Sequence, residues 1–154
     1  MKIRPTNPAW KRLLLGALLL LSFSAAAEPA AGTFKSVQGS VMITHGGVAA
    51  PAQVGMPVYQ SDRIATGADG ATGITFEDNS LLSLGPSAVL VIDRFAFDTT
   101  THDGAFEIEL DKGKLAVISG LIAKHQQDAM KVRTPASLLG VRGTEFVVEV
   151  GGGK

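Results

Sequence analysis

Three histidines are the side chains of this sequence best suited to acid–base or metal chemistry, namely His45, His102 and His125. Each lies beside turn-forming residues, and none belongs to a His-x-x-x-His or Cys/His pattern. A transition-metal site brings several such ligands together, so this spacing favours ordinary exposed loop histidines. We therefore predict no metal site and no cofactor.

Carboxylates offer two further arrangements. Asp93, Asp98 and Asp103 recur at five-residue intervals and could suggest Ca²⁺, but the twelve-residue calcium-loop pattern is absent. Glu77 and Asp78 could act as a general acid and base only if another carboxylate met them across a cleft, because neighbours along a strand point to opposite faces. Neither arrangement predicts a catalytic set.

Nucleophilic and phosphate chemistry are also poorly supported. No Gly-x-Ser-x-Gly pentapeptide occurs, although a serine hydrolase typically presents its nucleophile within one. The glycines of residues 67–73 are spaced like those of a phosphate loop, but we expect a strand to follow instead of a helix N-terminus, and Asp69 would repel phosphate. We predict a turn here, and a protein that is not an enzyme.

The most distinctive segment spans residues 132–146. Pro135 pre-sets a turn, and Gly140 and Gly143 bracket the cation of Arg142. Arg142 is either a structural residue, bonding carbonyls or a carboxylate through its five donors, or a contact for a partner. The flanking glycines and aliphatic residues suggest partial burial and favour the structural role.

The elements that must position these residues are short strands. Apolar and β-branched runs are stopped repeatedly by Gly, Pro, Asn or Asp, which is typical of strands joined by tight turns. The predicted strands are Ser40–Thr44, Ile64–Thr66, Thr72–Phe76, Leu81–Leu84, Val89–Ile92, Phe106–Leu110, Lys114–Ile118, Met130–Arg133 and Thr144–Val150.

This pattern predicts an all-β domain that is β-solenoid or roll-like, with a β-sandwich as the alternative. The shortness of the runs favours the solenoid slightly. Val89–Ile92 and Val147–Val148 do not alternate, so we expect both to be covered on both faces. Residues 119–129 form either a single helical turn or a mobile hairpin tip. We place the β domain at residues 33–150 and expect the Gly-rich tail, 151–154, to be flexible.

Residues 1–27 have the three parts of a secretory signal peptide: a basic start, the apolar run Leu13–Leu21, and small residues before Glu28. Ala25 and Ala27 fit an A-x-A cleavage site. The stretch of 15 residues from 13 to 27 is shorter than the roughly 20 apolar residues that span a bilayer. We therefore predict cleavage before Glu28 and a periplasmic protein, the alternative being an inner-membrane anchor.

Removal of this leader changes the charge. It carries four of the 14 basic residues, which leaves 10 positive and 14 negative groups and a net charge of −4. That balance disfavours a nucleic-acid partner, because such binding rests on Lys and Arg neutralising phosphates. The sequence has no cysteine, so stability must come from a packed core instead of disulfides.

The chain from about residue 39 to 150 resembles the FecR domain, the periplasmic sensing part of iron-dicitrate-type transmembrane regulators. The order and spacing of several short motifs carry the resemblance. They are Gly39-x-Val41, Asp62-Arg63-Ile64-x-Thr66-Gly67, Ile74-x-Phe76-x-Asp78-x-Ser80, Leu82-x-Leu84-Gly85-Pro86, Val132-x-Thr134-Pro135 and Val141-Arg142-Gly143-Thr144-x-Phe146.

The resemblance implies a set of candidate residues that are either structural or partner contacts. They are Asp62, Thr66, Gly67, Asp78, Pro135, Arg142, Gly143, Thr144 and Phe146. In such regulators the domain receives a signal from an outer-membrane receptor and passes it to a sigma factor through a transmembrane helix and a cytoplasmic segment. Only 12 residues precede the apolar run here, so we expect a free-standing exported copy of the domain.

The resulting functional expectation is a non-enzymatic periplasmic interaction or signal-sensing module that binds an unidentified protein or cell-envelope partner. Two alternatives remain open. The first is a self-assembling envelope scaffold that pairs through its β edges. The second is a membrane-anchored signalling regulator, if the leader is not cleaved. The sequence leaves the oligomeric state open.

Overall fold

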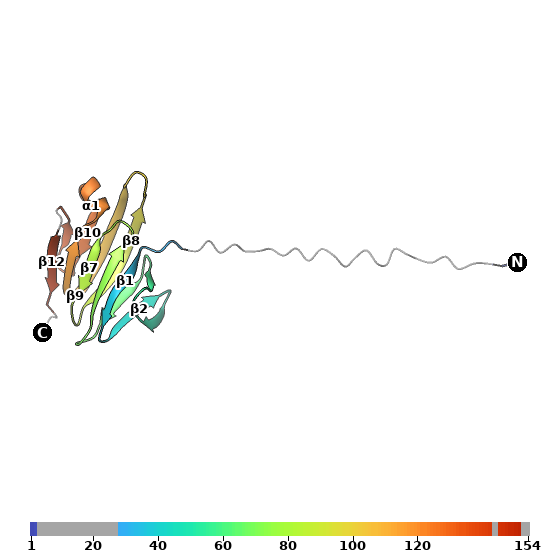
Figure 1. The fold of residues 1–154 in the computed structure, drawn as a ribbon, viewed down its shortest axis with the longest axis horizontal. Helices are drawn as coiled ribbons and strands as arrows, with labels where there is room; N and C mark the ends of the chain where they lie inside the picture. Colours follow the sequence, from blue (N-terminus) through green and yellow to red (C-terminus); the bar gives the residue numbers. More distant parts are fainter. Residues whose placement is uncertain (3–27, 143–144, 152–154) are drawn as a thin grey trace.

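A computed structural model describes residues 1–2, 28–142 and 145–151 of the chain. In this part, twelve strands form one strongly curled sheet, a half-barrel with a short helix at one end (Figure 1). The strands are β1 (Gly32–Gln38), β2 (Val41–His45), β3 (Val48–Pro51), β4 (Pro57–Val58), β5 (Arg63–Thr66), β6 (Ala71–Phe76), β7 (Leu81–Leu84), β8 (Val89–Phe97), β9 (Gly104–Ile118), β10 (Met130–Arg133), β11 (Leu138–Gly140) and β12 (Glu145–Val150), and the helix is α1 (Leu121–His125).

The long strand β9 belongs to two halves of the sheet. In one half the hydrogen-bonded order is β4-β1-β6-β7-β9-β12. In the other half it is β3-β2-β5-β8-β9-β10-β11. Every ladder within the described residues is antiparallel except that between β9 and β10, which is parallel. Because β9 takes part in both halves, its path decides how they face each other.

The two halves meet at a bend in the middle of β9. Gly113 has a φ of +90°, and the register between β8 and β9 shifts between Val89 and Leu90. A Cβ on Gly113 would lie 2.5 Å from the Cα and the Cβ of Ala88, so only glycine allows this approach. The sequence predicted two strands here, over 106–110 and 114–118, and the structure shows one strand that bends between them.

The core lies inside the curl, where alternate residues of each strand turn inward. β6 alternates partly buried and buried positions along its whole length, as expected for a half-exposed strand. The rings of Phe76, Phe95 and Phe106 pack together, with centroids 4.5–5.5 Å apart. Apolar burial therefore supplies the stability that a chain without cysteine requires.

The predicted all-β, roll-like fold is confirmed. A solenoid repeat contacts only its neighbours, whereas β9 pairs with β7, β8, β10 and β12, and antiparallel ladders dominate. The predicted runs over 40–44, 64–66, 72–76, 81–84, 89–92 and 130–133 all coincide with strands. The last predicted strand matches β12 from Glu145 onward, and Thr144 lies outside the described residues, as do residues 152–154 of the predicted tail and the leader from residue 3 to 27.

Some expectations need correction. The strands β1, β3, β4 and β11 were not predicted from the sequence, because they are short, interrupted or mixed in polarity. Val147 is 58% exposed, so the prediction that Val147–Val148 is covered on both faces is wrong. Val89–Ile92 is largely buried as expected. Of the two alternatives for residues 119–129, the helical turn is confirmed as α1. Among the residues that the structure describes, no helix is both long and apolar enough to cross a membrane.

Candidate functional site

Asp62 lies in the core and holds the loop before β5. Its side chain is buried, and its carboxylate accepts a hydrogen bond from the backbone N–H of Tyr59 at 2.8 Å. The Nδ1 of His45 lies 2.6 Å from the other carboxylate oxygen, and the His45 and Tyr59 rings pack at 4.8 Å. The side chain of His45 is half-exposed and paired with Asp62, and the residues around His45 in the sequence do not predict this pairing.

Thr66 and Gly67 fasten the turn between β7 and β8. The Oγ1 of Thr66 donates to the carbonyl of Gly85 at 2.7 Å and accepts the N–H of Ala88 at 2.8 Å. The carbonyl of Gly67 accepts the N–H of Ser87 at 2.9 Å. These two motif residues therefore fix backbone, and the loop that follows is a tight turn as predicted.

Asp78 caps α1 from the turn between β6 and β7. Its Oδ2 accepts from the hydroxyl of Ser80 at 2.8 Å and from the N–H of Ile122 at 3.4 Å, and its carbonyl accepts from Leu121 at 2.7 Å. Ser80 in turn accepts the N–H of Gly120 at 2.9 Å. The residue before the helix provides no side-chain cap. The turn between β6 and β7, which is distant in the sequence, therefore supplies the acceptors for the free N–H groups at the start of the helix.

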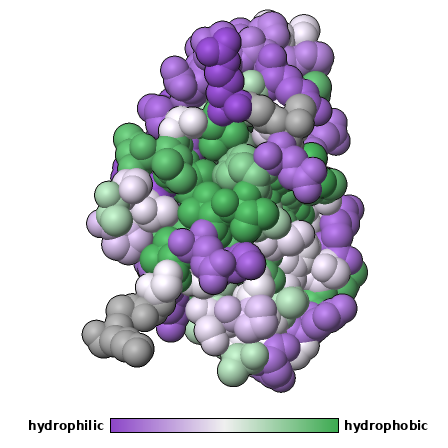
Figure 2. All heavy atoms as spheres, turned by 90° about the vertical axis from the view of Figure 1, so that its left-hand side faces the viewer, coloured by the Kyte–Doolittle hydropathy of each residue, from purple (hydrophilic) through white to green (hydrophobic). Residues whose placement is uncertain are grey.

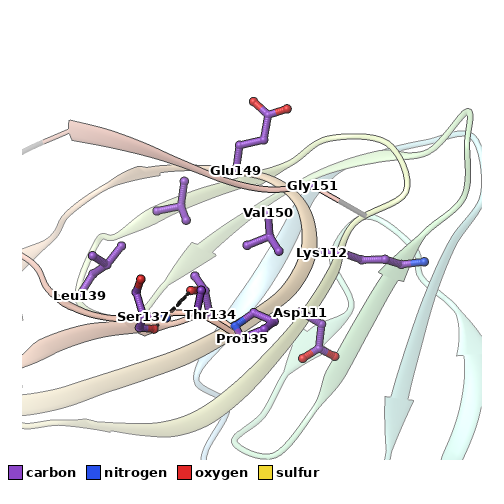
Figure 3. A pocket seen from close by; sticks show the side chains of 11 residues that line it. Asp111, Lys112, Thr134, Pro135, Ser137, Leu139, Glu149, Val150 and Gly151 are labelled. Carbon is purple, nitrogen blue, oxygen red and sulfur yellow. Dashed lines mark hydrogen bonds between the residues drawn. The ribbon is translucent and has the colours of Figure 1, made fainter. Parts of the chain in front are cut away.

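The C-terminal motif builds the walls of a groove between the β10–β11 hairpin and β12 (Figure 3). The hollow measures about 950 Å³, and the turn at residues 134–137 closes one side. A second hollow continues it along residues 139–148, since Leu139 and Val148 line both. The two edge strands β11 and β12 thus flank one continuous groove.

The groove is largely apolar because core-facing side chains are left uncovered there. Leu139 is paired with the buried Val132 and points to the same face, yet it is 41% exposed. Figure 3 shows Leu139 and Val150 lying between the strands. Val147, which lines the second hollow, adds exposed apolar surface. Figure 2 shows the resulting apolar area at the centre of the face that contains β12.

Pro135 and Arg142 lie at different parts of this groove. Pro135 is in the turn that Thr134 and Ser137 close, where the Ser137 N–H donates to the Thr134 hydroxyl at 3.0 Å (Figure 3). Arg142 lines the second hollow. It is exposed and forms no hydrogen bond or ion pair within the described residues, so the expected partial burial of Arg142 is wrong.

The remaining motif residues differ in what the structure says of them. Phe146 is partly buried and packs against the core from β12, where it also lines the second hollow. Gly143 and Thr144 lie outside the described residues. Ala25 and Ala27 of the predicted cleavage site do so as well, and Glu28 is the first residue described after them.

Two of the charges at the rim of the groove are paired. Asp111 accepts a hydrogen bond from Arg63 at 3.0 Å, and Glu149 lies 3.4 Å from Lys114. Lys112 lines the groove, and Figure 3 shows its side chain pointing outward. The groove therefore offers an apolar surface between polar ends, which suits an apolar segment of a partner better than a charged ligand.

The other candidates from the sequence lie apart from this groove. Asp93 is 3.4 Å from Arg133, and His125 is 3.4 Å from Asp103. His102 stacks on Phe97. Within residues 28–142 and 145–151, no group of three or more His, Cys, Asp or Glu side chains is placed to hold a metal ion.

The β8–β9 loop supplies a pH-dependent prediction. Hydrogen bonds from the backbone N–H groups of Thr101 and Thr100 lower the pKa of Asp98. A lowered pKa means that these bonds are present above the ordinary value and are lost as pH falls through the lowered one. The amide chemical shifts of Thr100 and Thr101 should therefore titrate with a midpoint below about 3.9, the ordinary Asp value. A midpoint at or above that value would contradict the loop geometry.

The structure is thus a small all-β domain with an open groove between two edge strands. A family model described as FecR protein matches residues 62–154, and the chain belongs to this family of regulatory sensing domains, which is not a family of enzymes. No curated protein and no solved structure matches the chain. The match covers the segment that forms β9 to β12 and thus both walls of the groove.

Proposed function

We propose that the mature chain is a non-enzymatic periplasmic sensing or interaction module that binds a protein or envelope partner in the groove between β11 and β12. The observation that carries the proposal is the uncovered inner face of these two strands. Side chains such as Leu139 face the core direction but remain open to solvent, and a partner would remove their apolar surface from water.

The distribution of the family motif supports this location. Asp62, Thr66 and Asp78 use their polar atoms on backbone groups, which explains them by the fold alone. Pro135 and Phe146 line the groove instead. A motif that both maintains the fold and forms an open surface is consistent with a binding domain.

The periplasmic location rests on the leader of residues 1–27, and fractionation tests it. Release of a protein beginning at Glu28 by osmotic shock would support export and cleavage. Retention in the inner membrane with the leader attached would favour the anchored regulator.

Affinity capture from envelope extracts tests the groove. We expect the mature domain to enrich a partner, and the Leu139→Asp variant to lose it because a carboxylate opposes apolar burial. Val54→Asp is the matched control, since Val54 is also exposed but lies outside the groove. Chemical cross-links should map to residues 134–151. Equal capture by Leu139→Asp and the wild type, or no enriched partner, would contradict the proposal.

A further inference from the structure

Within the described residues, four strands end the two halves of the sheet, and one of them, β12, has the longest and most regular edge. β3 ends at Pro51, β4 has two residues and begins at Pro57, and β11 has three residues. β12 has six residues, contains no Pro or Gly, and keeps a regular register with β9. Short strands and prolines are two common protections of sheet edges against pairing, and β12 has neither, although it carries the charges of Glu145 and Glu149.

The ladder between β7 and β9 determines which N–H and C=O groups of β12 point to its free edge. The N–H of Gly85 donates to the carbonyl of Lys114, so the backbone groups of Lys114 face β7. Because this direction alternates along a strand, those of Leu115 and Val117 face β12. Their partners Val148 and Phe146 are therefore bonded to β9. The N–H and C=O groups of Glu145, Val147 and Glu149 point to the free edge.

We propose that β12 pairs antiparallel with β12 of a second copy of this chain, with Val148 opposite Val148. Residues that point their backbone groups outward must meet one another, and the buried faces must coincide. Both conditions are satisfied only when odd-numbered residues pair with odd-numbered ones. Among such registers, only those centred on residue 147 or 148 pair five of the six residues of β12.

Charge decides between these two registers. Centring on Val147 puts each Glu145 opposite Glu149 of the other copy. Like charges directly opposite are destabilising. Centring on Val148 puts each Glu149 opposite Val147 and each Phe146 opposite Val150, so the apolar inner face continues across the twofold axis.

This dimer goes beyond the proposed binding function and rests on a different observation, the free backbone edge of β12. It is isologous, because the same six residues contribute on both sides. The dimer and the groove share β12, since Phe146 and Val147 also line the second hollow. The turn that contains Pro135 and the side chain of Leu139 belong to the other wall and do not form the pairing, so substitution of Leu139 tests partner binding without altering the paired strand.

A proline on the free edge tests the pairing. The N–H of Val147 donates nothing to β9, so Val147→Pro removes only the donor that would meet the second copy, and edge strands tolerate proline in such a position. Val147→Thr is the matched control, because it keeps both the N–H and the β-branch. In sedimentation equilibrium we expect a concentration-dependent dimer for the wild type and Val147→Thr, and a monomer for Val147→Pro with unchanged circular dichroism.

Charged substitutions at the same position test the register. With Val147 opposite Glu149, Val147→Lys should tighten the dimer and Val147→Glu should weaken it, each about fivefold for two equivalent cross-strand contacts. In the register centred on residue 147, both substitutions would place like charges opposite each other and weaken the dimer. Weakening by Val147→Lys would therefore overturn the proposed register.

The outcomes also separate dimerisation from partner binding. A wild-type protein that stays monomeric at high concentration, or a dimer that Val147→Pro leaves intact, would overturn the pairing. A monomer that still captures a partner through Leu139 would overturn the dimer and retain the proposed function. A dimer that captures no partner would overturn the proposed function and retain the pairing.

Discussion

The Gly113→Ala variant should lose about 3 kcal/mol of unfolding free energy, or fail to fold. An alanine at this φ of +90° adopts a backbone conformation that costs about 1–3 kcal/mol. Its Cβ would also lie 2.5 Å from Ala88, and accommodating such a group in a packed interior costs a further 1–3 kcal/mol or so. Urea unfolding followed by far-ultraviolet circular dichroism measures the change, since the chain has only one Trp, in the leader.

Gly55→Ala is the control that separates the two costs. Gly55 has nearly the same φ, +87°, but a Cβ there meets nothing within 4 Å. Its loss should be limited to the conformational cost, about 1 kcal/mol. Equal stability of the two variants would show that the close approach of β9 to Ala88 does not constrain the fold. The bend in β9 would then need a cause other than the missing side chain of Gly113.

This bend shows why the sequence predicted the strands better than their arrangement. Strands such as β6 and β7 are visible in the sequence because local runs of apolar residues stop at turn formers. The conformation of Gly113 and its approach to Ala88 depend on residues 25 positions apart, which no local pattern reports. The preference for a β-solenoid or roll over a β-sandwich therefore rested on the shortness of the runs.

The candidate site, too, could be predicted from the sequence only in part. The segment 132–146 was singled out from its turn and glycine residues, and it does form one side of the groove. The groove itself exists because β11 and β12 end different halves of the curled sheet, and that is a property of the topology. The burial of Arg142 was wrongly inferred from its neighbours, since it lies in the connection between two edge strands and not within the core.

Polar pairs between residues that are far apart in the chain could not be predicted from the sequence either. His45 and Asp62 are 17 residues apart, and Asp78 caps a helix more than 40 residues away. Asp62 stood out only through the family motif, and Asp78 was otherwise considered only as one of a pair of carboxylates with Glu77. The structure gives them a common role, because each buried carboxylate accepts backbone N–H groups that a turn or a helix end leaves free.

The second large effect is expected at Asp78. Asp78→Ala should lower the unfolding free energy by about 3 kcal/mol, because it leaves the buried N–H groups of Ser80 and Ile122 without an acceptor. The loss should be concentrated in α1, whose first N–H groups depend on this turn. Hydrogen exchange should therefore become faster at Ser80 and Ile122, which lose their acceptor, and change less at Leu121, whose acceptor is the backbone carbonyl that alanine keeps.

Asp69→Ala is the matched control for Asp78. Asp69 also accepts a backbone N–H, that of Ser40 at 3.3 Å, but it is exposed, so water replaces the lost acceptor. Its effect should stay below about 1 kcal/mol. The loss of unfolding free energy in Asp78→Asn should fall between those of the two alanine variants. The amide oxygen remains as an acceptor, but the amide nitrogen is a donor and would face another donor. If Asp78→Ala were no more destabilising than Asp69→Ala, the buried cap would contribute little, and the helix would be held chiefly by the packing of Ile122 in the core.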